Sequence, residues 1–383
     1  MKRLMILCLV VAPASVAVTE ESKRPITIDH MPHIVGLTAV GVGGPGQRGA
    51  VKGGASSARL PPGDPCASAG SIVYSGAPGV SGTGKCSIVS NGLVRTFRLH
   101  VPSSYVPGRS ALVISLHGNG TGADGLGQES KTLLSDHADR YGFAVVYPDS
   151  MPVGQGKNGW NIYQAETGAD DVGFVRAMTL HVLAAIQPDP KRVFLTGHSG
   201  GAIFTHLLAT LAPDLFAAGA PVSGVIALPP GHLDVGSYPP PRAPISMLMI
   251  NGEDDRTCAF CGGAGVNKRD GARYYQPSAE ESYAHWVAGN RCEGESSTLP
   301  LCTGPVSNLS AIDHKKATKC QGGVEVEFVG LRRAGHGWST KVMHNQSAPG
   351  SKEAFNSTLP TLDRDGVSIN DLVWRFFEAH PKR

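Results

Sequence analysis

The stretch RVFLTGHSGGAIFTHLLATL, residues 192–211, places Ser199 in the pattern Gly-x-Ser-x-Gly. The pattern alone is weak evidence, because a chain with 49 glycines produces such combinations by chance. Its context is more specific: residues 193–196 form an apolar run typical of a buried strand, and residues 202–211 form a helical pattern that ends before Pro213. A serine at such a strand-to-helix turn exposes its hydroxyl at the carboxyl end of a sheet, where α/β proteins bind their ligands.

Short apolar runs alternate with helical patterns along the chain from residue 92 onward. The runs are continuous rather than alternating, which is typical of strands covered on both faces of a parallel sheet. They lie at Leu112–Leu116, Phe143–Tyr147, Val193–Thr196 and Ile245–Ile250. Helices are predicted at 130–141, 172–186, 202–211, 280–289 and 369–379. This alternation predicts an α/β fold with a doubly wound, mostly parallel sheet.

A serine hydroxyl is a weak nucleophile, so catalysis by Ser199 would require a histidine base and an acid that orients it. In this fold class the acid and then the histidine follow the serine, each in a loop after a strand. Glu253, Asp254 and Asp255 follow the strand predicted at 245–250, and composition does not separate these candidate acids. His336 lies in a glycine-flanked loop after a later strand and is the candidate base.

The oxyanion of a tetrahedral intermediate requires two backbone N–H donors. The N–H of Gly200, directly after the serine, is one candidate, and the N–H of Asn119, in a glycine turn after the strand at 112–116, is the other. Trp160 and Trp338 are candidates for lining the acyl pocket, where an indole can stack on an aromatic or sugar ring. Core packing beside the site is the alternative for both tryptophans.

The N-terminus has the pattern of a secretory signal peptide, with Lys2 and Arg3 before a short apolar run and small residues. We therefore expect a signal peptide at 1–17 and an extracellular protein. Residues 18–87 are rich in glycine over much of their length and predict a partly disordered leader before a catalytic domain at 88–383. No later apolar stretch has the roughly 20 residues needed to span a bilayer, so no membrane association is expected.

The formal net charge is +3, and the short basic clusters are isolated from aromatic residues, so we expect no nucleic-acid partner. Of the 8 cysteines, Cys8 lies in the signal segment, and an oxidising compartment should pair most of the others. Cys258 and Cys261 have redox-like spacing but no second metal-spaced pair, so we interpret them as structural. We expect no metal, no cofactor and a monomer.

Several blocks in fixed order resemble secreted α/β-hydrolase esterases of the polyhydroxybutyrate depolymerase and feruloyl or acetylxylan esterase type. They include GLVRTFRLHVPSSY at 92–105, LVISLHGNGTGADG at 112–125, ADRYGFAVVYPD at 138–149, RVFLTGHSGGAIFTHLLA at 192–209 and CQGGVEVEFVGLRRAGHGW at 320–338. The resemblance implies the α/β-hydrolase fold, with Ser199 as nucleophile and His336 as base. It favours Asp255 as the acid, because the family pattern is Gly-x-x-Asp and Gly252 sets the register.

The resemblance also implies a disulfide between Cys292 and Cys320. From their neighbourhood in the sequence we add the pair Cys66 and Cys86, and three cysteines stay unassigned: Cys258, Cys261 and Cys302. The chain departs from the family pattern where Ser339 and Thr340 follow Trp338 in place of Pro-Gly, and again at 258–276. These departures weaken the transfer of a substrate from the family to this chain.

The resemblance implies a serine esterase that acts through an acyl-enzyme on an ester attached to a polymer. A feruloyl or acetylxylan esterase acting on plant polysaccharide is favoured, because no separate polymer-binding module is visible in the sequence. A polyhydroxybutyrate depolymerase is the alternative within enzymes. A non-catalytic secreted binding protein on the same scaffold is the alternative from another class.

Overall fold

The computed structural model describes residues 81–154, 157–164, 168–229, 231–266, 273–296, 312–331, 334–338 and 368–383. All of these residues belong to one compact unit of the chain, Ser56–Arg383. The predicted signal peptide and most of the predicted leader lie outside the described residues, and both stay predictions. None of the described helices is both long and apolar enough to cross a membrane.

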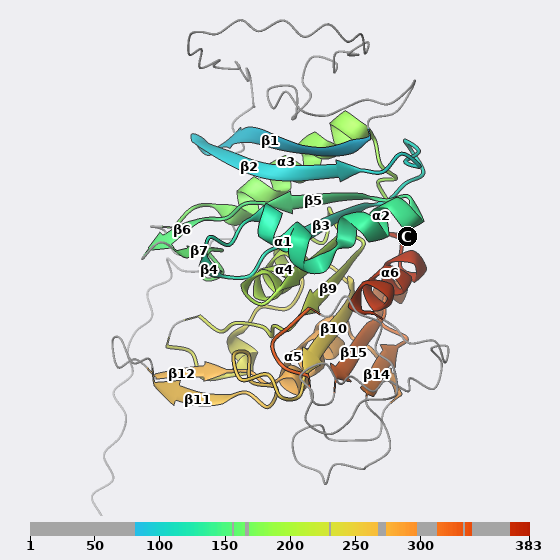
Figure 1. Ribbon diagram of the computed structural model, residues 1–383. Helices are drawn as coiled ribbons and strands as arrows, with labels where there is room; N and C mark the ends of the chain where they lie inside the picture. Colours follow the sequence, from blue (N-terminus) through green and yellow to red (C-terminus); the bar gives the residue numbers. More distant parts are fainter. Residues whose placement is uncertain are drawn as a thin grey trace, which may run out of the picture. The chain divides into compact units, whose positions relative to one another are not determined.

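A 10-stranded sheet organises the described residues, in the order β1-β2-β5-β3-β8-β9-β10-β15-β14-β13 (Figure 1). Its strands are β1 Gly82–Ser90, β2 Leu93–Val101, β3 Leu112–Leu116, β5 Ala144–Pro148, β8 Val193–His198, β9 Ala218–Val222, β10 Ser246–Gly252, β13 Gly294–Ser296, β14 Ile312–Thr318 and β15 Val326–Leu331. The strands from β5 to β15 in this order are parallel to one another, and the pairs at both edges are antiparallel. The predicted mostly parallel sheet is confirmed.

Helices cover both faces of the sheet: α1 Gly125–Thr132, α2 Leu134–Tyr141, α3 Asp171–Ile186, α4 Gly200–Leu211, α5 Ala279–Gly289 and α6 Ile369–Ala379. Phe174, Phe204 and Trp286 bring α3, α4 and α5 into one hydrophobic core. Leu134 and Phe377 bring α2 and α6 into a second core, which shares the strands of the sheet with the first. Because the central strands are buried between these cores, their sequences are continuous apolar runs.

Two smaller sheets lie beside the main one. The first contains β4 Gly120–Thr121, β6 Met151–Gly154 and β7 Lys157–Gly159, and the second is the hairpin of β11 Gly263–Val266 and β12 Arg273–Gln276. The first of these sheets begins in the segment that follows β3, which is the segment predicted to hold an oxyanion donor.

The helix predicted at 130–141 is two helices. Leu133 has a left-handed backbone with φ 51°, which ends α1 and begins α2. The Asp124 side chain accepts a hydrogen bond from the Gly127 N–H and starts α1 earlier than the apolar pattern indicated.

The sheet begins earlier than the predicted domain boundary at residue 88. Gly82–Ser90 pairs along its whole length with β2 through a hairpin whose turn residues, Asn91 and Gly92, have φ values of 48° and 76°. An Asn-Gly pair favours this type of two-residue turn, because both positions require positive φ. Residues 82–87 therefore belong to the sheet, and the predicted end of the leader at residue 87 was wrong.

The predicted disulfide between Cys292 and Cys320 is confirmed, and it joins the end of α5 to the segment that leads into β15. Cys86 and Cys261 are also disulfide-bonded. Cys66 lies outside the described residues, so its pairing with Cys86 stays a prediction. Cys258 is a free, buried cysteine. A structural bridge at Cys258 was therefore a wrong interpretation, although it holds for Cys261.

Candidate active site

Ser199 occupies the sharp turn between β8 and α4, with φ 57° and ψ −120°. A non-glycine residue with this φ is strained, and such strain is concentrated at functional sites. The turn also requires close packing: a Cβ at Gly201 would lie 2.2 Å from the Leu116 carbonyl oxygen. Ser199 is anchored by its own N–H, which donates to the Val222 carbonyl at 3.0 Å. These features have the geometry of a nucleophile elbow at the carboxyl end of the sheet, and the role of Ser199 as nucleophile stays a prediction.

His336 lies between Ser199 and Asp255. Its Nε2 is 2.7 Å from the Ser199 Oγ, and its Nδ1 is 2.7 Å from the Asp255 Oδ2. The distances fit a chain in which the serine hydroxyl donates to Nε2 and the Nδ1–H donates to the carboxylate. The His336 side chain is 20% exposed and that of Asp255 is 1% exposed, so the pair is shielded while the imidazole stays accessible.

Asp255 is the only one of the three candidate acids whose side chain is hydrogen-bonded to His336 in the described part of the chain. Its Oδ1 accepts hydrogen bonds from the N–H groups of Thr257, at 2.8 Å, and Cys258, at 2.9 Å. Burial raises the pKa of Asp255, but the hydrogen bonds from His336 and these two N–H groups outweigh it and hold the pKa below its usual value. The carboxyl group is therefore held as a carboxylate that orients His336.

Asp254 and Glu253 have a different role. The Asp254 N–H donates to the Ala334 carbonyl at 2.8 Å, and the Glu253 N–H donates to the Leu331 carbonyl at 2.9 Å. These backbone bonds join the acid loop to the histidine loop. Gly252 permits the approach, because a Cβ there would lie 2.4 Å from the Ala334 carbonyl oxygen.

Asn119 and Gly200 lie against each other beside Ser199. A Cβ at Gly200 would be 2.3 Å from the Asn119 Oδ1, and a Cβ at Gly118 would be 3.1 Å from the Ser199 Cβ. The N–H of Gly200 also begins α4, where the helix dipole favours negative charge. The arrangement suits two donors directed at an oxyanion, and that role stays a prediction for both residues.

His117 fixes the segment that carries Asn119, and our sequence analysis did not identify it. Its Nε2 accepts a hydrogen bond from the Ser150 N–H at 3.0 Å, so its Nδ1–H donates to the Gly118 carbonyl at 2.7 Å. Burial lowers the pKa of His117, which keeps the ring neutral and this hydrogen-bond pattern fixed. Its position next to the glycine turn after β3 is the signal that could have indicated it.

Residues 95–236 match the family described as Esterase PHB depolymerase. This segment contains Ser199 together with both candidate oxyanion donors. The matched segment belongs to that esterase family. Feruloyl esterase B of Neurospora crassa is 34% identical to this chain over 131 residues, which are 32% of this chain and 43% of that protein. Probable acetylxylan esterase A of Aspergillus niger is 34% identical over 132 residues, 32% of this chain and 42% of that protein.

Feruloyl esterase B of Piromyces equi is similar over a longer stretch, at 27% identity over 241 residues, or 61% of this chain and 41% of that protein. The chain thus spans less than half the length of these curated relatives. Among solved structures, an acetyl xylan esterase from Aspergillus awamori aligns with 66% of this chain and 94% of its own at 17% identity, with a TM-score of 0.46.

Both candidate tryptophans are buried. Trp160 lies within the segment that matches the family, and Trp338 lies after it. Trp160 stacks on Phe204 and donates its indole N–H to the His117 carbonyl at 2.7 Å, so it packs beneath the Asn119 segment. Trp338 donates its indole N–H to the Asn370 Oδ1 at 2.8 Å. In the structure both tryptophans are therefore packed in the core, and contact of either with an acyl group stays a prediction.

Asn370 connects three parts of the molecule. Its Oδ1 accepts from Trp338, two residues after His336, and its Nδ2 donates to the Thr132 carbonyl at 2.8 Å. Asn370 is 5% exposed, so both hydrogen bonds are shielded from water. The amide therefore holds the histidine loop between α6 and the end of α1.

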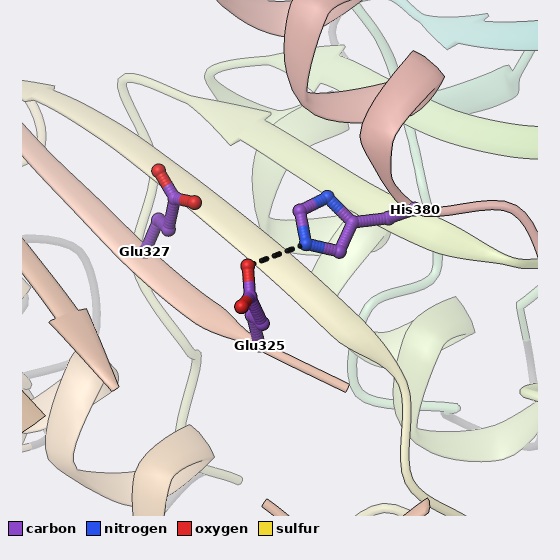
Figure 2. Close-up of side chains that lie close together, drawn as sticks. All are labelled: Glu325, Glu327 and His380. Carbon is purple, nitrogen blue, oxygen red and sulfur yellow. Dashed lines mark hydrogen bonds and ion pairs between the residues drawn. The ribbon is translucent and has the colours of Figure 1, made fainter. Parts of the chain in front are cut away.

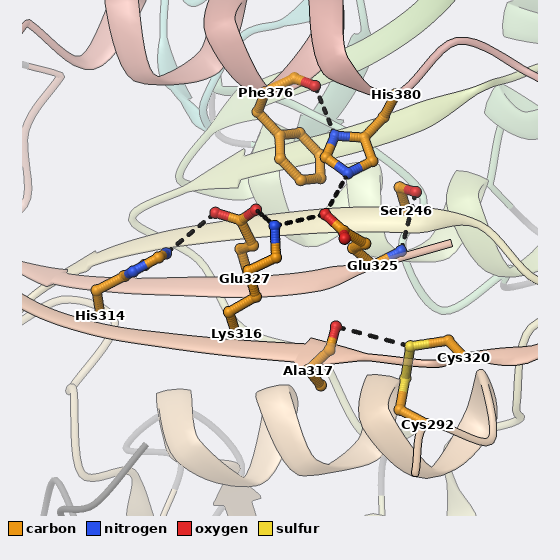
Figure 3. A network of polar contacts seen from close by, with 10 residues as sticks. All are labelled: Ser246, Cys292, His314, Lys316, Ala317, Cys320, Glu325, Glu327, Phe376 and His380. Carbon is orange, nitrogen blue, oxygen red and sulfur yellow. Dashed lines mark hydrogen bonds and ion pairs between the residues drawn. A yellow bond between two sulfur atoms is a disulfide. The ribbon is translucent and has the colours of Figure 1, made fainter. Parts of the chain in front are cut away.

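Among the described residues, Glu325, Glu327 and His380 have ligand atoms within 4.8 Å of one another, close enough to hold a metal ion (Figure 2). The Lys316 Nζ, however, lies 2.6 Å from Glu325 and 3.1 Å from Glu327 (Figure 3). An ammonium group already occupies the position between the carboxylates. We therefore interpret the cluster as an ion network that packs α6 on β14 and β15.

Proposed function

We propose that the protein is a carboxylic ester hydrolase that acts through an acyl-enzyme on Ser199. The observation that carries this proposal is the hydrogen-bonded chain Ser199–His336–Asp255, with both distances at 2.7 Å. The family match at 95–236 supports it, because that segment carries the nucleophile elbow.

In the proposed reaction, the Ser199 Oγ attacks the ester carbonyl while the His336 Nε2 takes its proton. Asp255 holds the imidazole in the required tautomer and stabilises the imidazolium that forms. The N–H groups of Gly200 and Asn119 stabilise the oxyanion. His336 then protonates the departing alcohol, and a water molecule activated by the same histidine releases the acid from Ser199.

The proposed substrates are feruloyl or acetyl esters on plant polysaccharide, since feruloyl esterase B and acetylxylan esterase are the names of the curated relatives above. A polyester of the polyhydroxybutyrate type is the second candidate, which the description of the matching family favours. We also propose that the protein is extracellular, because the Cys292–Cys320 disulfide is stable in oxidising compartments.

The test is hydrolysis of p-nitrophenyl acetate, methyl ferulate, acetylated xylan and polyhydroxybutyrate by the wild type and by Ser199→Ala. We expect the substitution to lower kcat on the order of 10⁶-fold, because the nucleophile is lost. Wild-type activity in Ser199→Ala would refute the acyl-enzyme. Absence of any ester hydrolysis by the folded wild type would instead favour a binding protein on an esterase scaffold. The ranking of the four substrates decides between polysaccharide and polyester.

A further inference from the structure

Three basic side chains lie in a row that begins at the proposed triad. The His198 ring is 5.1 Å from the His336 ring, measured between centroids, and the His198 Nδ1 is 3.4 Å from the Lys131 Nζ. Lys131 comes from the last turn of α1 and is exposed, whereas His198 is 4% exposed at the end of β8. The row therefore leads from the catalytic imidazole to an ammonium group that solvent can reach.

His198 is a neutral acceptor in this row. Burial, together with the nearby Lys131 and His336, lowers the pKa of His198 to about 3. A neutral ring that accepts from the Lys131 ammonium at Nδ1 carries its hydrogen on Nε2, which is buried without a hydrogen-bond partner among the described residues. His198 is therefore unsuited to be a base for Ser199, and it holds the ammonium in place.

Lys131 differs from the lysines of the ion network. Lys315 and Lys316 form ion pairs with glutamates, but no carboxylate of the described residues lies within 4.0 Å of the Lys131 ammonium. Burial lowers the pKa of Lys131, and no anion of the described residues opposes that effect. A partly buried ammonium with no counter-ion among the described residues is favourably placed to bind an anion.

Gly118 packs closely against both the serine and this row. A Cβ at residue 118 would lie 3.1 Å from the Ser199 Cβ and 3.6 Å from the His198 Nδ1. The alcohol portion of an ester departs from beside His336, because His336 protonates it. A charged group on that portion is thus released beside His336, whose ring lies 5.1 Å from the His198 ring that accepts from Lys131.

We propose that Lys131, positioned by His198, binds a carboxylate carried by the alcohol portion of the ester. The preferred substrate is then the ester of a hydroxycarboxylic acid, and a neutral ester of the same shape reacts more slowly. The chemistry is shared by the acid end of a hydroxyalkanoate oligomer and by a uronic acid of a polysaccharide. This inference rests on the proposed esterase function and deepens it.

The experiment compares two acetyl esters that differ only in charge: 3-acetoxybutyrate and 3-acetoxybutyramide. Acetate release is measured for both at low ionic strength, where the attraction between exposed charges is least screened. We expect the wild type to favour the carboxylate about fivefold in kcat/KM, as an exposed ion pair allows. Raising the salt concentration should reduce this preference, and Lys131→Arg should retain part of it.

Lys131→Met should abolish the preference, with the ratio of the two kcat/KM values falling to about one. Lys85→Met is the matched control, because Lys85 is an exposed lysine on the edge strand β1, and its ratio should equal that of the wild type. Thermal denaturation shows whether each variant is folded. Using an O-acetylated uronic acid and its amide as a second pair identifies which source of carboxylate is preferred.

Equal rates on the two esters by the wild type would overturn the inference and leave the esterase proposal intact. A preference that survives in folded Lys131→Met would also overturn it. Failure of the folded wild type to release acetate from either ester, or from p-nitrophenyl acetate, would overturn the esterase proposal itself.

Discussion

Two histidine–carboxylate pairs lie at opposite ends of β15, and they use the same chemistry differently. Asp255 and His336 are joined at 2.7 Å in the loops after the strands, and Glu325 and His380 are joined at 2.9 Å before β15 (Figure 3). The second nitrogen of His336 faces the Ser199 hydroxyl, whereas that of His380 faces the Phe376 carbonyl at 2.7 Å. A carbonyl has no proton to give. The group that faces the second ring nitrogen, a hydroxyl for His336 and a carbonyl for His380, therefore distinguishes the proposed catalytic pair from the structural pair.

Both ring nitrogens of His380 face oxygen acceptors, so its two hydrogen bonds form together only in the protonated ring. His336 instead has one acceptor and one hydroxyl as neighbours, which suits a neutral ring that gains a proton during the reaction.

The largest effect should separate the two histidines. His336→Ala should lower kcat on the order of 10⁶-fold with little change in Tm, because the base is lost from a partly exposed loop. His380→Ala should leave kcat nearly unchanged and cost about 1–2 kcal/mol of unfolding free energy, through lost packing on Phe376 and lost hydrogen bonds. Steady-state kinetics and thermal denaturation of both variants test this. Comparable losses of kcat would erase the distinction.

The next effect should separate neighbouring acids. Asp255→Asn should lower kcat by about 10³–10⁴-fold while KM changes little, because an amide cannot hold the imidazole in the required tautomer. Asp254→Asn is the matched control, since the Asp254 side chain is exposed and its link to Ala334 is through the backbone. The control should keep kcat within about twofold. A large loss in Asp254→Asn would reassign the acid.

A smaller effect is expected at Asn370, which connects α6 to the histidine loop. Asn370→Asp keeps the acceptor for Trp338 but removes the donor to the Thr132 carbonyl. We expect kcat to fall about tenfold near neutral pH, with KM little changed, because a carboxylate facing a carbonyl displaces the loop. Protonating the carboxyl at lower pH restores a donor, so the ratio of variant to wild-type kcat should rise with falling pH. A pH-independent ratio would indicate a merely structural role.

The smallest effect should come from Glu327 in the ion network. Burial raises the pKa of Glu327, but the hydrogen bonds and charges of His314 and Lys316 lower it by more than burial raises it. The pKa of Glu327 in the folded protein therefore lies below its usual value. The carboxylate therefore stabilises the fold above the ordinary glutamate pKa of about 4.3, and this stabilisation is lost as pH falls through the folded pKa.

Glu327→Gln should cost less than about 1 kcal/mol of unfolding free energy at pH 7, since the network is partly exposed to solvent. The difference from the wild type should vanish in acid, as urea unfolding at several pH values would show. Glu378→Gln, on the exposed face of α6, is the control and should have no effect at any pH. A difference that persists in acid would mean that lost packing, rather than charge, is responsible.

The central part of the fold could be predicted from the sequence because it consists of repeated local patterns. β3 and α6 occur at the predicted residues, since a strand buried on both faces and an amphipathic helix each leave a clear pattern. The break at Leu133 and the hairpin at β1 were missed. The helix break depends on a left-handed backbone at Leu133, a position where no glycine signals it. The hairpin depends on the Asn91-Gly92 turn, which was overlooked.

The candidate site was predictable where chain order limits the choices, as for Ser199 and His336. The register of the acid required the family pattern, because three adjacent carboxyl groups have similar local sequences. His117 was missed although its position beside the glycine turn is a local signal. Asn370 and Lys131 were not predictable, since each contacts a group distant in sequence. Contacts of this kind depend on tertiary packing, which produces no periodic pattern in the sequence.

The reactivity of the Cys258 thiol, in the Asp255 loop, differs between the folded and the unfolded chain. In the native protein its thiol is buried, and burial together with Asp255 raises the pKa to about 12, so almost no thiolate is available for exchange. In the unfolded chain the same thiol is three residues from Cys261 and is no longer protected from disulfide exchange by burial. The carboxylate proposed to orient the His336 imidazole thus lies three residues before a thiol that only the folded structure protects from exchange.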